Sequence, residues 1–385
     1  MQERERRSWR TLAALVVLGP VFLASASPAA AAAAVAAAPV AVAAAPAIAR
    51  VPAVTAQTAL GALAPGSKEC LANKAAGTVR FASPFGYDAS AGIIDVYAAL
   101  KLGYFADLCL NVDFVYVPFT ESPYSLVSAG TAQITGEGSA ADAIVQESEG
   151  SDFVAVSTYG DTSDYALLTR SGITKLTQLD GKVLGYHPTF PVVLREMLVK
   201  GGVDLSKLRS VIDPSFNPLL LIHGTFSAIQ AYQSNEPITL RADHEPFTMW
   251  TPAQFGIPGT FNVQVVNRKF LASHPTATAD FLRAEFLAFN YCVRNAVTCV
   301  DFLAKAQGPT FDVAHGEAEW RFESMLALDH HLPGEGVGVQ SPAEWAPEAD
   351  AVVQYKLLDK AVNLASVENT SITASLYHGT QLIWP

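Results

Sequence analysis

The sequence has few of the residues that metal and thiol chemistry require. Only four cysteines occur among 385 residues, and none forms a C-x-x-C pair, so neither a zinc ribbon nor a thioredoxin-type redox motif is indicated. A G-x-S-x-G nucleophile elbow is also absent, and that motif is the usual sign of an α/β-hydrolase serine. We therefore expect no catalytic residues, no metal site and no cofactor.

Basic residues are scarce as well. The chain has 25 Lys and Arg against 36 Asp and Glu. Residues 1–65 hold five of the basic and two of the acidic residues, so the rest carries 20 basic and 34 acidic residues, a formal net charge of −14. Nucleic acids and anionic membrane surfaces attract basic patches. We therefore expect neither nucleic acid nor a membrane surface as a partner.

Long apolar segments are missing too, since none reaches the ~20 residues of a membrane-spanning helix without a charge or a proline. The amino terminus instead has the order of a secretory signal peptide. Four arginines in the first ten residues precede an apolar stretch at 12–24 and small residues at 25–29. We expect a signal peptide at 1–28 and export to the periplasm or cell envelope. Arg6-Arg7 leaves open whether the route is general secretory or twin-arginine.

Residues 29–65 consist almost entirely of Ala, Val and Pro. Such a tract has no polar face, and its prolines interrupt a helix, so it is typical of a linker or an extended signal region. The remaining chain is long enough for one large domain or two small lobes.

From residue 79 onward short strands alternate with helices. We expect strands at 79–82, 112–117, 133–135 and 153–157, with helices at 91–102 and 139–148. A second run has strands at 183–186 and 210–212 around a helix at 192–199, and isolated strands are expected at 165–169 and 262–266. This order is typical of an α/β protein with parallel or mixed sheets.

Two α/β runs joined by two extended crossings predict two lobes with a ligand cleft between them. The first part of lobe 1 is expected at 66–168 and lobe 2 at 169–263. Lobe 1 is then completed at 264–385, which includes the C-terminal helices and a long helix that starts near residue 275.

The four cysteines favour disulfides if the protein is exported. The expected pairs are Cys70 with Cys109 and Cys292 with Cys299. The second pair would lie about 10 Å apart on a continuous helix, too far to bond, so the helix would have to break at Asn295. Four buried free thiols remain the alternative.

Several segments together resemble a known protein family. They are 102–112 (LGYFADLCLNV), 179–185 (LDGKVLG), 230–237 (QAYQSNEP), 255–258 (FGIP) and 274–284 (HPTATADFLRA). In order and spacing they are similar to segments of ABC-transporter solute-binding proteins, in the superfamily that binds thiamine-pyrimidine precursors, riboflavin, sulfonates and nitrate. The resemblance covers roughly residues 79–310.

The resemblance implies the type II periplasmic-binding fold, ligand capture by lobe closure, a membrane-embedded ABC permease as partner and a monomeric receptor. The bulky loop at 186–190 suits an aromatic heterocycle, pyrimidine- or flavin-like, better than a sulfonate. A sulfonate or other small anion is the alternative ligand. A secreted enzyme on the same fold is the alternative of another class.

The candidate ligand-binding residues lie in loops that the proposed fold directs into the cleft. They are Phe85, Tyr87, Asp88, Glu137, Ser139 and Tyr159 on the first lobe, and Tyr186, His187, Thr189, Phe190, Asn235 and Glu236 on the second. Tyr87 and Asp88 are expected to grip the ligand together with Tyr186 and Glu236. For the aromatic residues the alternative is ordinary core packing, and for Asp88 it is a turn or helix cap.

Overall fold

The computed structural model describes residues 61–385, with the exception of 119–121, 188–189 and 214. For Glu137 it describes the backbone but not the side chain. The expected signal peptide and nearly all of the Ala-rich segment lie outside the described residues. The described residues belong to a single contact unit of the chain. Among their helices, none combines the length and apolar character that crossing a bilayer requires.

The first of two five-stranded sheets has the strand order β2-β1-β3-β10-β4. Its strands are β1 (Thr78–Ser83), β2 (Asn111–Tyr116), β3 (Ile134–Glu137), β4 (Phe153–Gly160) and β10 (Phe261–Asn267). β1 runs parallel to β2 and β3, whereas β10 is antiparallel to both β3 and β4. The sheet is therefore mixed, and its antiparallel member comes from a distant part of the chain.

The second sheet has the strand order β7-β6-β8-β5-β9. Its strands are β5 (Tyr165–Arg170), β6 (Val183–Tyr186), β7 (Arg209–Ile212), β8 (Ala228–Tyr232) and β9 (Phe247–Trp250). β6 runs parallel to β7 and β8, and β5 is antiparallel to β8 and β9. The two sheets thus repeat one plan, a parallel core with an antiparallel strand inserted.

The chain crosses between the two sheets at 161–164 and again at 251–260. The first crossing ends at Tyr165. Residues 165–168, which we expected in the first lobe, therefore belong to the second sheet. The second crossing contains the 3-10 helix η2 (Pro252–Phe255) and ends where β10 begins at Phe261, so residues 261–263, which we expected in the second lobe, belong to the first sheet. Each boundary is displaced by a few residues, the usual uncertainty of element ends.

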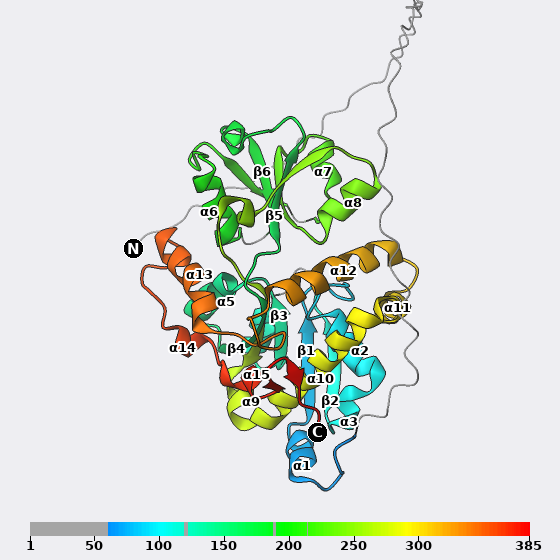
Figure 1. Ribbon diagram of the computed structural model, residues 1–385. Coiled ribbons are helices and arrows are strands. Elements are labelled where there is room, and N and C mark those ends of the chain that lie inside the picture. The colour runs from blue at the N-terminus through cyan, green and yellow to red at the C-terminus, as the bar shows by residue number, and fades with distance from the viewer. Residues whose placement is uncertain (1–60, 119–121, 188–189, 214) are drawn as a thin grey trace, which may run out of the picture. The chain divides into compact units, whose positions relative to one another are not determined.

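Helices cover the first sheet (Figure 1). They are α1 (Lys68–Ala75), α2 (Ile94–Leu102), α3 (Tyr104–Asp107), α4 (Pro123–Ser128), α5 (Ala140–Ser148), α9 (Arg268–Ser273), α10 (Pro275–Arg294), α11 (Ala296–Gln307), α12 (Val313–His330), α13 (Pro342–Gln354), α14 (Leu364–Val367) and α15 (Ser371–Ala374). α10 packs against α2, and α13 packs against α5. The chain ends near a short hairpin of β11 (Tyr377–His378) and β12 (Gln381–Leu382).

The second sheet carries α6 (Val192–Lys200), α7 (Leu219–Ile222), α8 (Glu236–Ala242) and the 3-10 helix η1 (Leu176–Leu179). Each sheet with its helices forms one half of the fold, and two helices of the first half also contact the second half. α12 contacts both β4 and α8, and α13 contacts α6. Side chains from α12 are therefore placed where they can face residues of both sheets.

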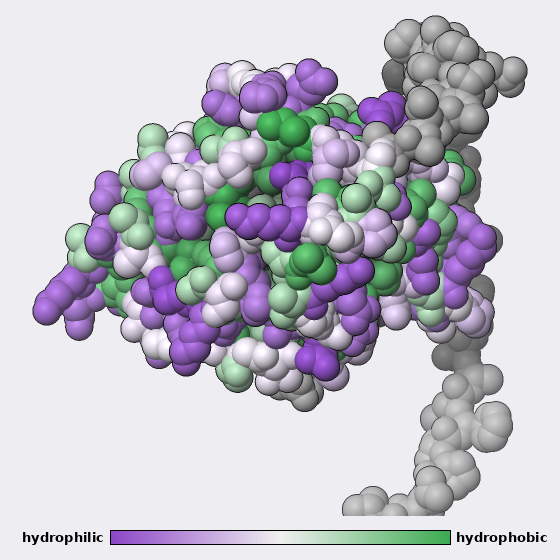
Figure 2. Space-filling view, turned by 90° about the horizontal axis from the view of Figure 1, so that it is seen from below, coloured by the Kyte–Doolittle hydropathy of each residue, from purple (hydrophilic) through white to green (hydrophobic). Residues whose placement is uncertain are grey.

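The largest apolar side chains are inside the protein. Trp320, Trp345 and Phe281 are almost completely excluded from solvent. Figure 2 shows one face of the molecule, on which hydrophilic and hydrophobic residues are interspersed. Burial of such aromatic side chains supplies much of the free energy that holds the helices to the sheet.

Both expected disulfides are present, Cys70–Cys109 and Cys292–Cys299. The second one depends on a break between α10 and α11. Asn295 leaves the helical conformation with φ −133° and ψ 43°, and its side-chain amide donates to the carbonyl of Tyr291. This break brings the two Cα atoms to 5.7 Å, and no free thiol occurs among the described residues.

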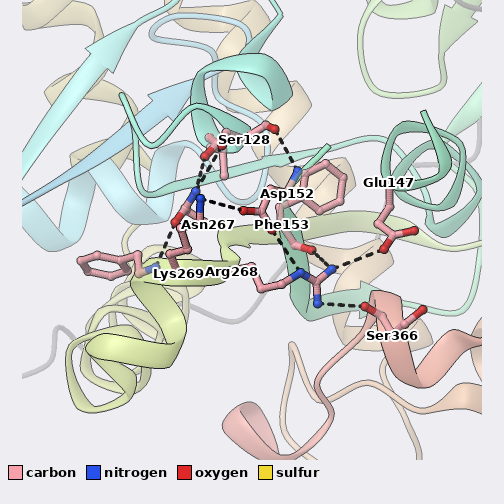
Figure 3. Close-up of polar contacts among 10 residues, drawn as sticks. Ser128, Glu147, Asp152, Phe153, Asn267, Arg268, Lys269 and Ser366 are labelled. Carbon is pink, nitrogen blue, oxygen red and sulfur yellow. Dashed lines mark hydrogen bonds and ion pairs between the residues drawn. The ribbon is translucent and has the colours of Figure 1, made fainter. Parts of the chain in front are cut away.

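The chain returning from the second sheet is anchored by Asn267 and Arg268 at the end of β10 (Figure 3). The Arg268 guanidinium donates to the carbonyls of Phe153 and Ser366 and lies within 3.4 Å of the carboxylates of Glu147 and Asp152. One side chain at the start of α9, directly after β10, therefore connects this segment with β4, α5 and α14.

Candidate functional site

A cavity of about 350 Å³ lies where loops and strand ends of the two sheets meet. Its wall is formed by the loop after β1, the end of β3, both crossings, the loops after β7 and β8, and α12. The lining residues are Pro84, Phe85, Asp88, Ser90, Ala91, Ile93, Gly136, Gly138, Asp164, Tyr165, Ser215, Phe216, Tyr232, Ser234, Asn235, Thr260, Phe261, Asn262, Glu319 and Glu323. This volume is at the lower end of the range for small-molecule sites.

One part of the wall is aromatic. The ring of Phe85 meets Phe216 at 6.2 Å and Tyr232 at 5.8 Å between centroids, both edge to face. Phe85 comes from the first sheet, whereas Phe216 and Tyr232 come from the second. A flat ring bound here would thus contact aromatic side chains of both halves.

The polar part of the wall is acidic. Asp88, Asp164, Glu319 and Glu323 line it, and the described lining residues include no Lys, Arg or His. Glu319 and Glu323 share a face of α12 because they are four residues apart. Among the described residues, no group of three His, Cys, Asp or Glu is arranged to hold a metal ion.

Hydrogen bonds connect these carboxyl groups across both halves. Glu323 accepts the backbone N–H of Ala91 at 2.6 Å and lies near the hydroxyl of Ser234. The same hydroxyl donates to Asp164 at 2.8 Å. Glu319 lies beside Asp88, so two carboxyl groups meet in this part of the wall.

Three buried polar atoms of the cavity residues have no hydrogen-bond partner. They are Oδ1 of Asp164, Oε2 of Glu319 and Nδ2 of Asn262. Asn262 has a left-handed backbone, φ 47°, and its amide reaches this position because Gly92 has no Cβ that would collide with it. Unsatisfied polar atoms are rare inside proteins, so a cluster of them beside a cavity indicates a missing partner.

Burial controls the protonation of these acids. It raises the pKa of Asp164 to about 8, a shift that the Ser234 hydrogen bond opposes and the charge of Glu236 increases. Burial also holds the pKa of Glu319 well above its ordinary value, and the adjacent charge of Asp88 adds to this. The pKa of Glu323 is raised in the same way, by burial and then by the charge of Asp164.

The two crossings are held by a second hydrogen-bond network beside the cavity. Tyr165 donates its hydroxyl to Asp142 of α5 at 3.0 Å. Thr260 donates its hydroxyl to Glu348 of α13 at 2.6 Å and accepts the backbone N–H of Ala140 at the same distance. Both crossings are thereby fixed to the amino-terminal end of α5.

Three of the candidate residues named from the sequence line the cavity. Phe85 and Asp88 do so from the loop after β1, and Asn235 does so from the loop before α8. The carboxylate of Asp88 also accepts the backbone N–H of the next residue, Ala89, at 2.7 Å. A role in binding stays a prediction for all three.

The other candidates of the first half do not lie at the cavity wall. Tyr87 stacks on Phe114 with a centroid distance of 5.5 Å. Tyr159 is fully buried, and its hydroxyl lies within hydrogen-bond distance of the carboxyl groups of both Asp95 and Glu285. Ser139 is the N-cap of α5. These residues make packing or capping contacts in the structure, and a role in binding stays a prediction for them.

The same holds for most candidates of the second half. Tyr186 and Phe190 meet edge to face at 5.8 Å, away from the cavity wall. His187 lies behind it and stacks on Phe216 at 3.9 Å. Glu236 is buried and accepts the backbone N–H of Tyr232 at 2.9 Å. Thr189 and the side chain of Glu137 lie outside the described residues.

Three of the four acidic residues of the wall were missed from the sequence, and so was Asn262. Asp164 directly precedes a predicted strand, whereas Asp88 was chosen because it lies in the loop that follows one. Glu319 and Glu323 have helical spacing, but nothing local shows that α12 reaches the second half. Asn262 lies inside a predicted strand, where its left-handed backbone could not be foreseen.

Comparisons with known proteins agree with this architecture. Residues 90–296 match the model of a family described as "NMT1/THI5 like". A formylaminopyrimidine-binding protein of Halalkalibacterium halodurans is 22% identical over 258 residues, which cover 65% of this chain and 77% of that protein.

Solved structures share the fold at lower identity. The alkanesulfonate-binding protein SsuA of Xanthomonas axonopodis pv. citri superposes with a TM-score of 0.57 at 15% identity, covering 76% of this chain and 98% of its own. The periplasmic nitrate-binding protein NrtA of Synechocystis PCC 6803 does so with a TM-score of 0.57 at 10% identity, covering 77% and 86%. The chain thus has the fold of periplasmic binding proteins, with two α/β lobes joined by two crossings.

Proposed function

Because the chain belongs to the NMT1/THI5-like family, we propose that it is the extracytoplasmic substrate-binding component of an ABC importer. In this proposal it is a monomeric receptor that captures a small aromatic heterocycle, pyrimidine- or flavin-like, and delivers it to a membrane permease. No chemical conversion of the ligand is part of this function.

The observation that carries the proposal is a cavity whose aromatic wall comes from both halves of the fold. Phe85 of one half contacts Phe216 and Tyr232 of the other, so these rings form one continuous wall for a ligand only when the halves are together. Burial of a ring against such side chains contributes about 1–3 kcal/mol for each aromatic partner. Ligand binding would therefore favour the closed arrangement over an open one.

The wall also favours a heterocycle over the alternative ligand, a sulfonate or other small anion. An anion needs a cationic side chain or several inward-facing N–H groups to offset its loss of water. The described lining residues offer four carboxyl groups and no basic side chain. Amino groups and ring N–H groups of a heterocycle are, in contrast, suitable donors to carboxylate oxygens.

The direct test is native mass spectrometry of protein purified gently from its host, followed by calorimetry with the molecule that is found. We expect one small ring-containing molecule per chain, returned unchanged after prolonged incubation. Steady conversion of that molecule into a product would contradict a binding function and favour the enzyme alternative. Retention of an inorganic anion or sulfonate would contradict the heterocycle.

Matched variants connect the result to this cavity. Phe216→Ala should weaken binding at least tenfold, about 1.4 kcal/mol, because it removes one side of the aromatic wall. Phe270→Ala is the control, because this half-buried ring lies on α9 and packs near His274 rather than at the cavity. Equal affinity of the two variants would mean that the ligand binds elsewhere.

A further inference from the structure

The cavity contains more negative charge than a neutral heterocycle would require. Asp88 belongs to the loop after β1, Asp164 to the first crossing, and Glu319 and Glu323 to α12. Glu236 of α8 adds a fifth carboxyl group next to Asp164. These elements face one another across the cavity, and the described lining residues bring no positive charge to it.

The acids of the wall lie close together, so ionising all of them in the closed, empty cavity is unfavourable. Ser234 donates its hydroxyl proton to Asp164 at 2.8 Å. Burial and the charges of neighbouring carboxylates raise the pKa of Asp164, Glu319 and Glu323. We therefore expect the empty cavity to retain protons, which a bound positive charge would replace.

The free atoms define where such a charge would bind. Oδ1 of Asp164 and Oε2 of Glu319 are buried, belong to residues of the wall, and have no partner. Asp164 is 5% exposed and Glu319 is 2% exposed. The other carboxylate oxygen of Asp164 accepts the hydroxyl of Ser234, and Glu319 lies beside Asp88. Positioned acceptors of this kind suit a group with several N–H donors and a formal positive charge.

We infer that the ligand is an organic cation, a flat ring that bears a protonated amine or an amidinium group, and that Asp164 and Glu319 bind this group. The inference rests on the proposed binding function and specifies its ligand class. The aromatic wall holds the ring, and the acidic wall selects the charge. Neutral flavin-like rings and anions would leave the acids without a counter-ion.

The test uses three compounds on each of two rings, pyrimidine and benzene. The ring bears an aminomethyl group, which is a cation, the same group N-formylated, which is neutral, or a carboxylate. Calorimetry should show the aminomethyl compound binding at least tenfold more tightly than its N-formyl partner on the same ring. Glu319→Gln and Asp164→Asn should each reduce that preference at least tenfold.

Glu317→Gln is the matched control, because Glu317 lies on the same helix but outside the cavity wall. It should keep the full preference for the cation. A thermal melt of each variant establishes that it is folded, and two separate variants guard against a loss of folding in one of them.

The affinity for the aminomethyl compound should also rise with pH. Asp164 has a folded pKa of about 8, so a cation that pairs with it must displace a proton at lower pH. Between about pH 6 and about pH 8 the affinity should rise by up to tenfold per pH unit. Calorimetry in two buffers of different ionisation enthalpy should register the released proton, and the N-formyl compound should show neither effect.

The remaining outcomes separate this inference from the proposed function. Tighter or equal binding of the N-formyl pyrimidine would overturn the inference and leave the proposed function standing. Cation-selective binding on benzene alone would support the inference and remove the preference for pyrimidine. No binding of either aminomethyl compound at about 1 mM, or preference for the carboxylate, would overturn the inference as well.

Discussion

The hydroxyl of Tyr165 donates a hydrogen bond to the carboxylate of Asp142 at 3.0 Å, and this bond links the first strand of the second sheet to α5 of the first half. Asp142 also closes the capping box of α5 by accepting from the backbone and hydroxyl of Ser139. The carboxylate that caps α5 is thus also the one that accepts the hydrogen bond from the end of the first crossing. Tyr165 lines the cavity as well, so this bond couples closure to the site.

We expect Tyr165→Phe to weaken ligand binding without unfolding the protein. The variant keeps the ring in the wall and removes one hydrogen bond, a net loss of about 0.5–1.5 kcal/mol. Affinity should fall two- to tenfold, and X-ray scattering of the ligand-free variant should show a larger radius of gyration. Tyr291→Phe, which removes a hydroxyl on α10 outside the cavity wall, should change neither quantity.

A second prediction concerns the anchor in Figure 3. Arg268→Met keeps the aliphatic part of the side chain but leaves the carbonyls of Phe153 and Ser366 without their donor. We expect the free energy of unfolding to fall by about 2 kcal/mol, in the range for loss of a charged hydrogen-bond network. Chemical denaturation measures it. Arg321→Met, at an exposed position on α12, should stay within about 0.5 kcal/mol of the parent.

The alternation of strands and helices was readable from the sequence because each element has its own hydrophobic period. β1, β6 and α6 begin within one residue of the positions expected. β8 was not recognised as a strand, although it pairs with both β5 and β6. This strand has only five residues, AIQAY, and is buried on both faces, so it shows no alternation of apolar and polar residues. Neighbouring strands, and not local pattern, determine such a strand.

The site was less accessible to sequence reasoning than the fold. Phe85 and Asp88 could be found because they follow a strand, where ligands in α/β folds bind. Tyr87 stands between them in sequence, yet its ring turns to Phe114. Glu319 lies more than 150 residues from Asp164, and only the packing of α12 against both halves brings them to one cavity. Long-range packing of this kind has no local signal.

The third prediction concerns the two disulfides. Thiol counting on denatured, non-reduced protein should detect no free thiol, since all four cysteines are paired. By the entropy of loop closure, Cys70–Cys109, with a separation of 39 residues, should contribute about 4 kcal/mol, and Cys292–Cys299 about 2–3 kcal/mol. Replacing each pair by serine and measuring denaturation should therefore show the larger loss for the first pair. Four reactive thiols would contradict both bonds.

The last prediction is that the ligand-free protein becomes less stable as the pH rises. Asp164 has a folded pKa of about 8, raised by burial from 3.8, and burial raises the pKa of Glu319 as well. A raised folded pKa means that the folded state binds protons more tightly than the unfolded state. Its stabilising effect is complete below the unfolded pKa and is lost as the pH rises through the folded pKa.

We therefore expect the free energy of unfolding to fall between about pH 4 and about pH 8, by at least about 1.4 kcal/mol, the equivalent of one pKa unit. Asp164→Asn and Glu319→Gln should each make this dependence shallower and should raise stability at the upper end. Chemical denaturation at several pH values measures the slope. Glu317→Gln should leave it unchanged, since Glu317 is on α12 but outside the cavity wall. An identical slope in all three variants would mean that the cavity acids hold no protons in the empty protein at these pH values, which would contradict the raised pKa of Asp164.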